Sequence, residues 1–149
     1  GWDAKLTLDN IREMADEAGV LEKTVFTGRE KDSHDIAGTI DAGVIASVRS
    51  ETVCRIAMEF MAMGIPVVCS DTNVIPEVVR DGETGFVTPA GNPEAMATAM
   101  KQILNARDRI ESFGKASRAL AEREYSIESF ASKTIEAYGS IVGYGNKNG

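Results

Sequence analysis

The segment from Arg55 to Met63 has the composition of a buried helix, and it contains one acidic side chain, Glu59. Burying an isolated carboxylate is costly, so Glu59 needs a partner. Arg55, one helical turn earlier, could form an ion pair worth about 0.2–0.5 kcal/mol. The hydroxyl groups of a ligand are the alternative, because a carboxylate can accept two hydrogen bonds from a vicinal diol. Spacing alone favours the ion pair.

Polar residues follow two segments that have the composition of buried strands. Residues 47–52 follow the apolar run 42–46, and residues 71–73 follow the run 66–70. In open α/β sheets, ligands bind beyond the carboxyl ends of the strands, where helix N-termini also point. We therefore expect the two polar segments to lie close together. Glu51, in the first of them, is by default a solvated surface charge.

Predicted strands and helices alternate along the chain, which indicates an α/β fold with a parallel sheet and right-handed crossovers. Thr7 and Gly19 are candidate caps of the first helix, and Asn92 followed by Pro93 marks another helix start. The continuous apolar run 42–46 suits a strand buried on both faces. The predicted strands are 24–27, 42–46, 66–70 and 85–87, and the predicted helices are 8–18, 36–40, 55–63, 76–79, 93–104, 109–123 and 126–142.

The composition excludes several classes of protein. The 149 residues carry a net charge of −7, with 43% hydrophobic and 26% charged residues, as in one globular domain. No apolar run reaches the length of about 20 residues that spans a bilayer, and no secretion signal opens the chain. Two cysteines cannot form a disulfide framework, so a reducing, cytoplasmic location is expected. The acidic balance argues against a nucleic-acid polymer, although a helix N-terminus can hold a small anion.

Residues 47–68 resemble a segment of the family-four retaining glycosyltransferases. The hallmark of that family is a pair of glutamates separated by seven residues, and Glu51 and Glu59 have this spacing. A helix of small and apolar residues, Gly64 and a Pro-Val-Val strand follow, as in the family. Later blocks at 75–79, 81–87 and 92–97 also match in order, and the resemblance runs from about Val25 to Ile141. This ordered set changes the interpretation of Glu59 from an ion pair to a ligand contact.

The resemblance implies the GT-B architecture, in which two Rossmann-like domains face a cleft. Residues 1–142 would then be an incomplete C-terminal, nucleotide-sugar-binding domain with a parallel sheet and flanking helices, and residues 143–149 a flexible tail. The parent enzyme would transfer a sugar from a UDP-, GDP- or ADP-linked donor with retention. The N-terminal acceptor-binding domain has no counterpart in the chain, and neither does the segment whose Arg and Lys grip the donor phosphates, so we expect the chain alone to be inactive.

The resemblance also implies a role for particular residues. Glu59 would accept hydrogen bonds from the ribose hydroxyls, and Glu51, the candidate catalytic residue, would hold hydroxyls of the donor sugar. Backbone amides near Val53, Cys54 and Arg55, in the segment that starts with Thr52, would face the diphosphate. Free amides and the helix dipole favour an anion there. Transfer in this family is described as metal-independent, so no metal or cofactor is expected.

Two departures from the family pattern suggest an alternative. Val53 and Cys54 stand where the family often has an aromatic residue and then Gly or Pro, and Asn73-Val74 replaces the usual Gly-Gly. A non-catalytic, degenerate GT-B module that acts in assembly or interaction is therefore the second hypothesis, and another GT-B enzyme such as an epimerase is the third. His34 matches no family position and is expected on the surface.

Three further expectations concern packing. Cys54 and Cys69 are expected to be free, buried thiols. Met58, Met61 and Met63 have the spacing of packing residues rather than of a metal site. An incomplete sheet edge and unpartnered apolar helix faces invite self-association.

Overall fold

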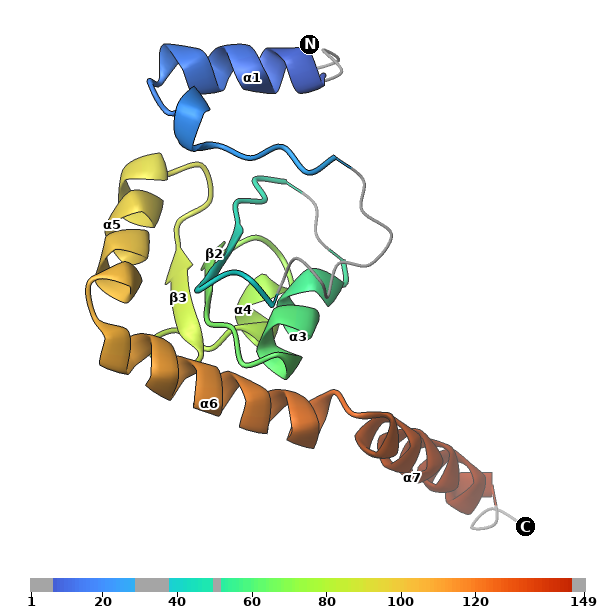
Figure 1. The fold of residues 1–149 in the computed structure, drawn as a ribbon. Helices are drawn as coiled ribbons and strands as arrows, with labels where there is room; N and C mark the ends of the chain where they lie inside the picture. Colours follow the sequence, from blue (N-terminus) through green and yellow to red (C-terminus); the bar gives the residue numbers. More distant parts are fainter. Residues whose placement is uncertain (1–6, 29–37, 50–51, 146–149) are drawn as a thin grey trace. The chain divides into compact units, whose positions relative to one another are not determined.

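The computed structural model describes residues 7–28, 38–49 and 52–145, and it divides the chain into two compact units, Gly1–Ser33 and His34–Gly149 (Figure 1). His34 and the tail residues 146–149 lie outside the described residues. Of the described helices, none combines the length and the apolar character needed to cross a membrane.

The first unit contains helix α1 (Leu8–Glu17) and a short 3-10 helix, η1 (Leu21–Lys23). Thr7 caps α1 as predicted, because its hydroxyl accepts a hydrogen bond from the Asn10 amide at 3.3 Å. The Asn10 side chain accepts from the Thr7 amide in return, at 3.1 Å, which completes a capping box.

The predicted strand at 24–27 is wrong, since these residues are not assigned to a strand. A strand is defined by hydrogen bonds to a neighbouring strand, and the described part of the first unit, residues 7–28, contains no other extended segment to pair with. Phe26 is instead covered by the Arg12 guanidinium, which lies 5.3 Å from the ring centre.

The second unit is built on a three-stranded parallel sheet with the order β1 (Gly43–Ile45), β2 (Val67–Ser70) and β3 (Gly85–Thr88). Val44 pairs with Val68, and Val68 pairs in turn with Phe86. Helices connect the parallel strands, so the predicted α/β class with a Rossmann-like parallel sheet is confirmed (Figure 1).

Helices cover both faces of this sheet. Helices α3 (Arg55–Ala62) and α4 (Ile75–Val78) pack on one face through Ala57, Met61 and Ile75, and α5 (Pro93–Leu104) packs on the other through Ala99 and Ile103. Helix α6 (Arg107–Glu124) contacts both α3 and α5, and α7 (Ile127–Gly145) follows it (Figure 1). The two core clusters therefore lie on opposite faces of β2, with Val67 and Cys69 in one and Val68 in the other.

Two glycines allow backbones to approach closely in this core. A Cβ atom on Gly114 of α6 would lie 2.3 Å from the carbonyl oxygen of Gly64, the residue with φ +73° that follows α3. A Cβ atom on Gly85 of β3 would lie 1.9 Å from the Val67 carbonyl oxygen. Neither position has room for a side chain, so these contacts fix α6 against the end of α3 and β3 against β2.

Several predicted boundaries and burials need correction. Val44 is 44% exposed, so β1 is not buried on both faces. It is an edge strand of the described sheet, and Val44 lines an open hollow of about 300 Å³ together with Val68 and Met100. Residues 38–39 form a turn rather than part of a helix at 36–40, and 36–37 lie outside the described residues. Helix α7 continues to Gly145, three residues beyond its predicted end.

Candidate functional site

The polar segments that follow β1 and β2 are in direct contact, as predicted. The Ser47 carbonyl oxygen accepts hydrogen bonds from the hydroxyl groups of Ser70 and Thr72, each at 2.5 Å. Ser47 lies two residues beyond β1, while Ser70 ends β2. These two hydrogen bonds join the segments that follow β1 and β2 at the carboxyl edge of the sheet. From Ser47 the chain continues toward the N-terminus of α3.

The N-terminus of α3 is only partly open to a ligand. Cys54 is its N-terminal cap residue and is fully buried, and its carbonyl oxygen accepts from the amides of Ala57 and Met58 at 3.1 and 3.3 Å. The Arg55 amide donates to the Val53 carbonyl at 2.8 Å, so this one of the predicted phosphate-facing amides already has a partner. Thr52 and Val53 are exposed beside it.

Glu59 has the structural partner that spacing predicts. Its Oε1 atom lies 3.7 Å from Nη2 of Arg55 on the preceding turn of α3. The Arg55 side chain is 82% exposed and that of Glu59 is 31% exposed, so this is a surface ion pair worth at most about 0.5 kcal/mol.

Glu59 also lines a groove of about 440 Å³ between α3 and the C-terminal part of α6. The groove has apolar walls from Met58 and Tyr125, and its charged residues are Glu59 and the Arg118–Glu122 ion pair. A half-buried carboxylate at the wall of such a groove is suited to bind hydroxyl groups. Glu51 lies outside the described residues, so the geometry of the site is defined from Glu59.

Asn73 has a left-handed backbone, with φ 49°, directly after the segment that closes the carboxyl edge. It stands where the resemblance predicts the first of two glycines. Asn is one of the few residues with a side chain that tolerates this conformation, so the turn keeps a glycine-like geometry without glycine.

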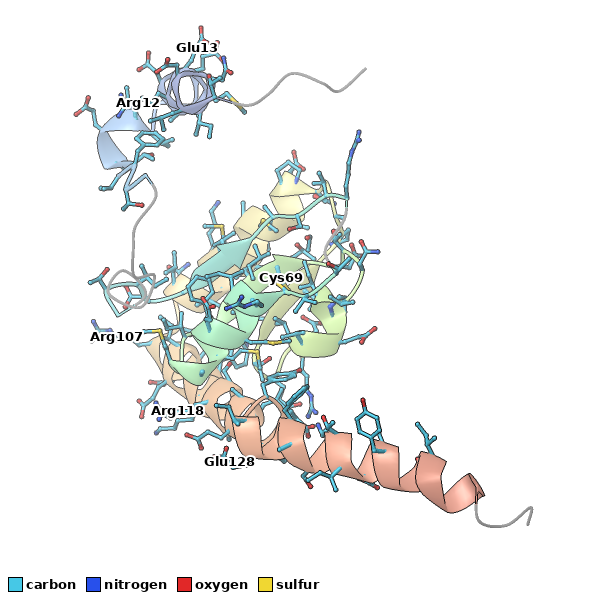
Figure 2. All side chains as sticks on the ribbon, turned by 90° about the vertical axis from the view of Figure 1, so that its right-hand side faces the viewer. Arg12, Glu13, Cys69, Arg107, Arg118 and Glu128 are labelled. Carbon is cyan, nitrogen blue, oxygen red and sulfur yellow. The ribbon has the colours of Figure 1, made fainter. Side chains whose placement is uncertain are left out.

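The two cysteines are free and buried, as predicted. Burial, together with the nearby Cys54, Asp81 and Asp71, raises the pKa of the Cys69 thiol to about 12. Figure 2 shows Cys69 inside the α/β unit. A thiol with this pKa stays protonated and is a poor nucleophile or metal ligand. Within residues 7–28, 38–49 and 52–145, no group of three or more His, Cys, Asp or Glu side chains could hold a metal ion.

The family model of glycosyl transferases group 1 matches residues 4–120. The chain belongs to this family. Membership confirms the predicted resemblance at the level of the group 1 family and accounts for the ordered blocks from α3 to the start of α5.

Named relatives agree with this assignment. A phosphatidyl-myo-inositol mannosyltransferase of Mycobacterium leprae is 32% identical over 141 residues, which are 93% of this chain and 37% of the relative. Spore coat protein SA of Bacillus subtilis is 26% identical over 142 residues, or 92% of this chain and 38% of the relative. The chain therefore spans less than two fifths of the length of these relatives.

Solved structures show the same fold. Anabaena HepE in complex with UDP superposes with a TM-score of 0.82 at 21% identity, covering 89% of this chain and 37% of HepE. The C-terminal domain of LpcC, a glycosyl transferase group 1 protein of Francisella tularensis, gives 0.70 at 20% identity and covers 80% of this chain and 62% of that one. The fold of this group 1 chain is thus that of a C-terminal GT-B domain.

A second hollow in this group 1 domain is lined by none of the residues that the sequence predicts to bind the donor. About 730 Å³ in volume, it is lined by residues of α6 together with Asp41 and Gly64, which precede β1 and β2. It therefore lies at the amino edge of the sheet, opposite the junction at Ser47. Figure 2 shows two of its residues, Arg107 and Arg118, along α6.

Sequence reasoning missed the hydroxyl group of Ser70. It placed Ser70 inside a strand and assigned Thr72 only to a polar segment. The available signal was a pair of hydroxyl residues two positions apart at the end of a buried strand, since buried hydroxyls need partners.

Proposed function

We propose that this chain is the donor-binding part of a retaining glycosyltransferase and that Glu59 binds the ribose of a nucleotide-sugar. The observation that carries the proposal is a half-buried carboxylate on α3, the helix that starts at the carboxyl edge of the sheet, in a chain of the group 1 family. The M. leprae relative is named a mannosyltransferase, and the HepE structure holds UDP, which supports a nucleotide-linked donor.

Each part of the donor would meet a different part of the site. The Glu59 carboxylate accepts hydrogen bonds from vicinal ribose hydroxyls. The diphosphate lies toward the N-terminus of α3, near Thr52 and Val53, where the helix dipole and the exposed Arg55 guanidinium favour negative charge. Glu51 holds hydroxyls of the donor sugar and is the proposed catalytic residue. Charge on the departing diphosphate is then stabilised electrostatically, without a metal ion.

The remainder of the enzyme is a proposed partner of this chain. The chain spans 37% of the M. leprae relative, and in GT-B enzymes the acceptor binds to the other domain. Helix α7 exposes a row of apolar side chains, which are Ile127, Phe130, Ile135, Tyr138 and Ile141. Contact with an N-terminal domain would bury this row, and we expect no sugar transfer by the 149-residue chain alone.

Calorimetric titration with UDP, GDP and ADP tests the proposal. Glu59→Gln keeps the size of the side chain but removes its charge, so the Kd for the preferred nucleotide should rise by about 10- to 100-fold, as for loss of a hydrogen bond to a charged group. Glu111→Gln is the matched control, because Glu111 also forms an i,i+4 pair on a helix, with Lys115. Its Kd should equal that of the wild type.

Two results would contradict the proposal. If Glu59→Gln binds normally and only unfolds at a lower temperature, Glu59 has a structural role, and the ion pair with Arg55 is the better account of it. If a longer protein that includes the phosphate-gripping segment binds none of the three nucleotides, the second hypothesis, a degenerate module for assembly or interaction, is favoured. The observation behind that hypothesis is the fully buried Cys54 at the α3 cap, where the family pattern has Gly or Pro.

A further inference from the structure

A pair of buried hydroxyl groups holds the loop that leads toward the candidate donor site. Ser70 is 1% exposed and Thr72 is 5% exposed, and both contact the Ser47 carbonyl oxygen at 2.5 Å. They reach across 23 and 25 positions of sequence to do so. Their own oxygens are 3.3 Å apart.

Counting hydrogens shows how this cluster is arranged. Each hydroxyl has one hydrogen, and a carbonyl oxygen has two lone pairs. The Ser47 carbonyl oxygen can only accept, so the hydrogens of both hydroxyl groups point to it and occupy its two lone pairs. The contact between the Ser70 and Thr72 oxygens then contains no hydrogen and adds no bond of its own. The pair is a two-point clamp on one peptide group.

The clamped peptide lies where the chain leaves β1 for α3. After Ser47 the described residues before α3 are Val48, Arg49, Thr52, Val53 and the cap residue Cys54, and α3 starts at Arg55. The loop end is attached to β2, which is buried along its whole length. A ligand-binding loop attached to a rigid strand loses less conformational freedom when the ligand binds.

We propose that Ser70 and Thr72 are positioning residues of the donor site, and that their hydroxyl groups fix the chain at Ser47, where it leaves β1. The proposal rests on the proposed donor-binding function for its consequence, but the clamp itself can be tested without a donor. Neither residue touches the donor directly, because both side chains are buried.

Hydrogen exchange detected by mass spectrometry tests the clamp. Thr72→Val keeps the shape of the side chain and removes its hydroxyl, whereas Thr72→Ser keeps the hydroxyl. The backbone amides of Ala46 to Arg49 should exchange about tenfold faster in Thr72→Val, as expected for loss of one hydrogen bond, and at the wild-type rate in Thr72→Ser. Ser70→Ala should raise the exchange rate of the same amides by a similar factor. If Thr72→Val does not fold, Ser70→Ala is used for the test instead.

Titration with UDP and GDP then tests the consequence for binding. The Kd should rise severalfold in Thr72→Val and return to the wild-type value in Thr72→Ser. If a longer protein that includes the phosphate-gripping segment binds neither nucleotide, the donor-binding function is contradicted, while the exchange result still decides whether the clamp exists. If Thr72→Val or Ser70→Ala lowers only the melting temperature and leaves exchange of the loop unchanged, the hydroxyls merely stabilise the sheet edge and the proposal fails.

Discussion

Asn73 shows how a single residue can replace a family glycine without changing the backbone. Its φ of 49° lies in the left-handed region, which costs an L-residue roughly 1–2 kcal/mol unless the side chain compensates. Asn compensates better than β-branched residues because its short amide can bond locally to the backbone. At this first position of the family's Gly-Gly pair, Asn73 therefore keeps a backbone conformation that glycine also adopts.

Substitutions at Asn73 should separate backbone strain from side-chain contacts. We expect Asn73→Val to lower the free energy of unfolding by about 1–2 kcal/mol, and Asn73→Gly to change it by less than about 0.5 kcal/mol. Urea denaturation at 25 °C measures both. Val74→Ala is the control, because the backbone of the neighbouring Val74 is right-handed, at φ −81°, and its substitution does not test left-handed strain. A valine variant as stable as the wild type would show that the turn relaxes freely.

Among the elements, the junction between α6 and α7 depends on a small charge cluster. Glu124, in the last turn of α6, accepts hydrogen bonds from Lys133 of α7 at 2.7 Å and from Arg123 at 3.0 Å. These bonds hold the pKa of the Glu124 carboxyl low, at about 2. The Ser126 hydroxyl accepts from the Ser129 amide at 3.2 Å and caps the start of α7.

This cluster predicts an acid-sensitive link between α6 and α7. The pKa of Glu124 is lower in the folded chain than its ordinary value of 4.5, so the contact stabilises the fold above about pH 4.5 and loses this effect as the pH falls toward 2. In Lys133→Met the Glu124 carboxyl should titrate closer to 4.5, as followed by carboxyl ¹³C NMR. Lys101→Met, which removes an exposed lysine from α5, should leave the titration at the wild-type value. Identical titrations in both variants would rule out the Lys133 contact.

The elements that sequence predicted well are those whose signals are local. Caps and apolar spacing placed α1, α3 and α5 within a few residues, because helix hydrogen bonds join residues close in sequence. The strand at 24–27 and the burial of Val44 were wrong, since both depend on which distant segment lies alongside. The contact between the segments after β1 and β2 was predictable, because parallel strands bring their carboxyl ends together.

At the scale of the whole molecule, two surfaces of the second unit lack cover. Along α7 the exposed apolar side chains share one side of the helix, and Ser132, Glu136 and Ser140 lie on the other. Among the described residues, β1 pairs only with β2, and the Gly43 amide donates to the Pro66 carbonyl oxygen on that side. Because neighbouring residues of a strand point their amides in opposite directions, the Val44 amide points toward the free edge.

We expect the apolar face of α7 to cause self-association of the chain, since it is the longer of the two surfaces. Sedimentation velocity in 0.15 M salt, where repulsion from the net charge of −7 is screened beyond about 8 Å, should show an average mass that rises with concentration. The double variant Phe130→Glu, Ile141→Glu should remain monomeric. A variant with the same added charge on the polar side, Ser132→Glu, Ser140→Glu, should associate as the wild type does.

The strand edge gives a different pattern of results. If association runs through β1, Val44→Lys abolishes it, because a lysine on an edge strand blocks pairing with another sheet, and the α7 variants have no effect. If the wild-type chain is monomeric at every concentration, neither surface drives association. Loss of association in the α7 variant alone would identify the apolar face of α7 as the surface through which copies of the chain associate.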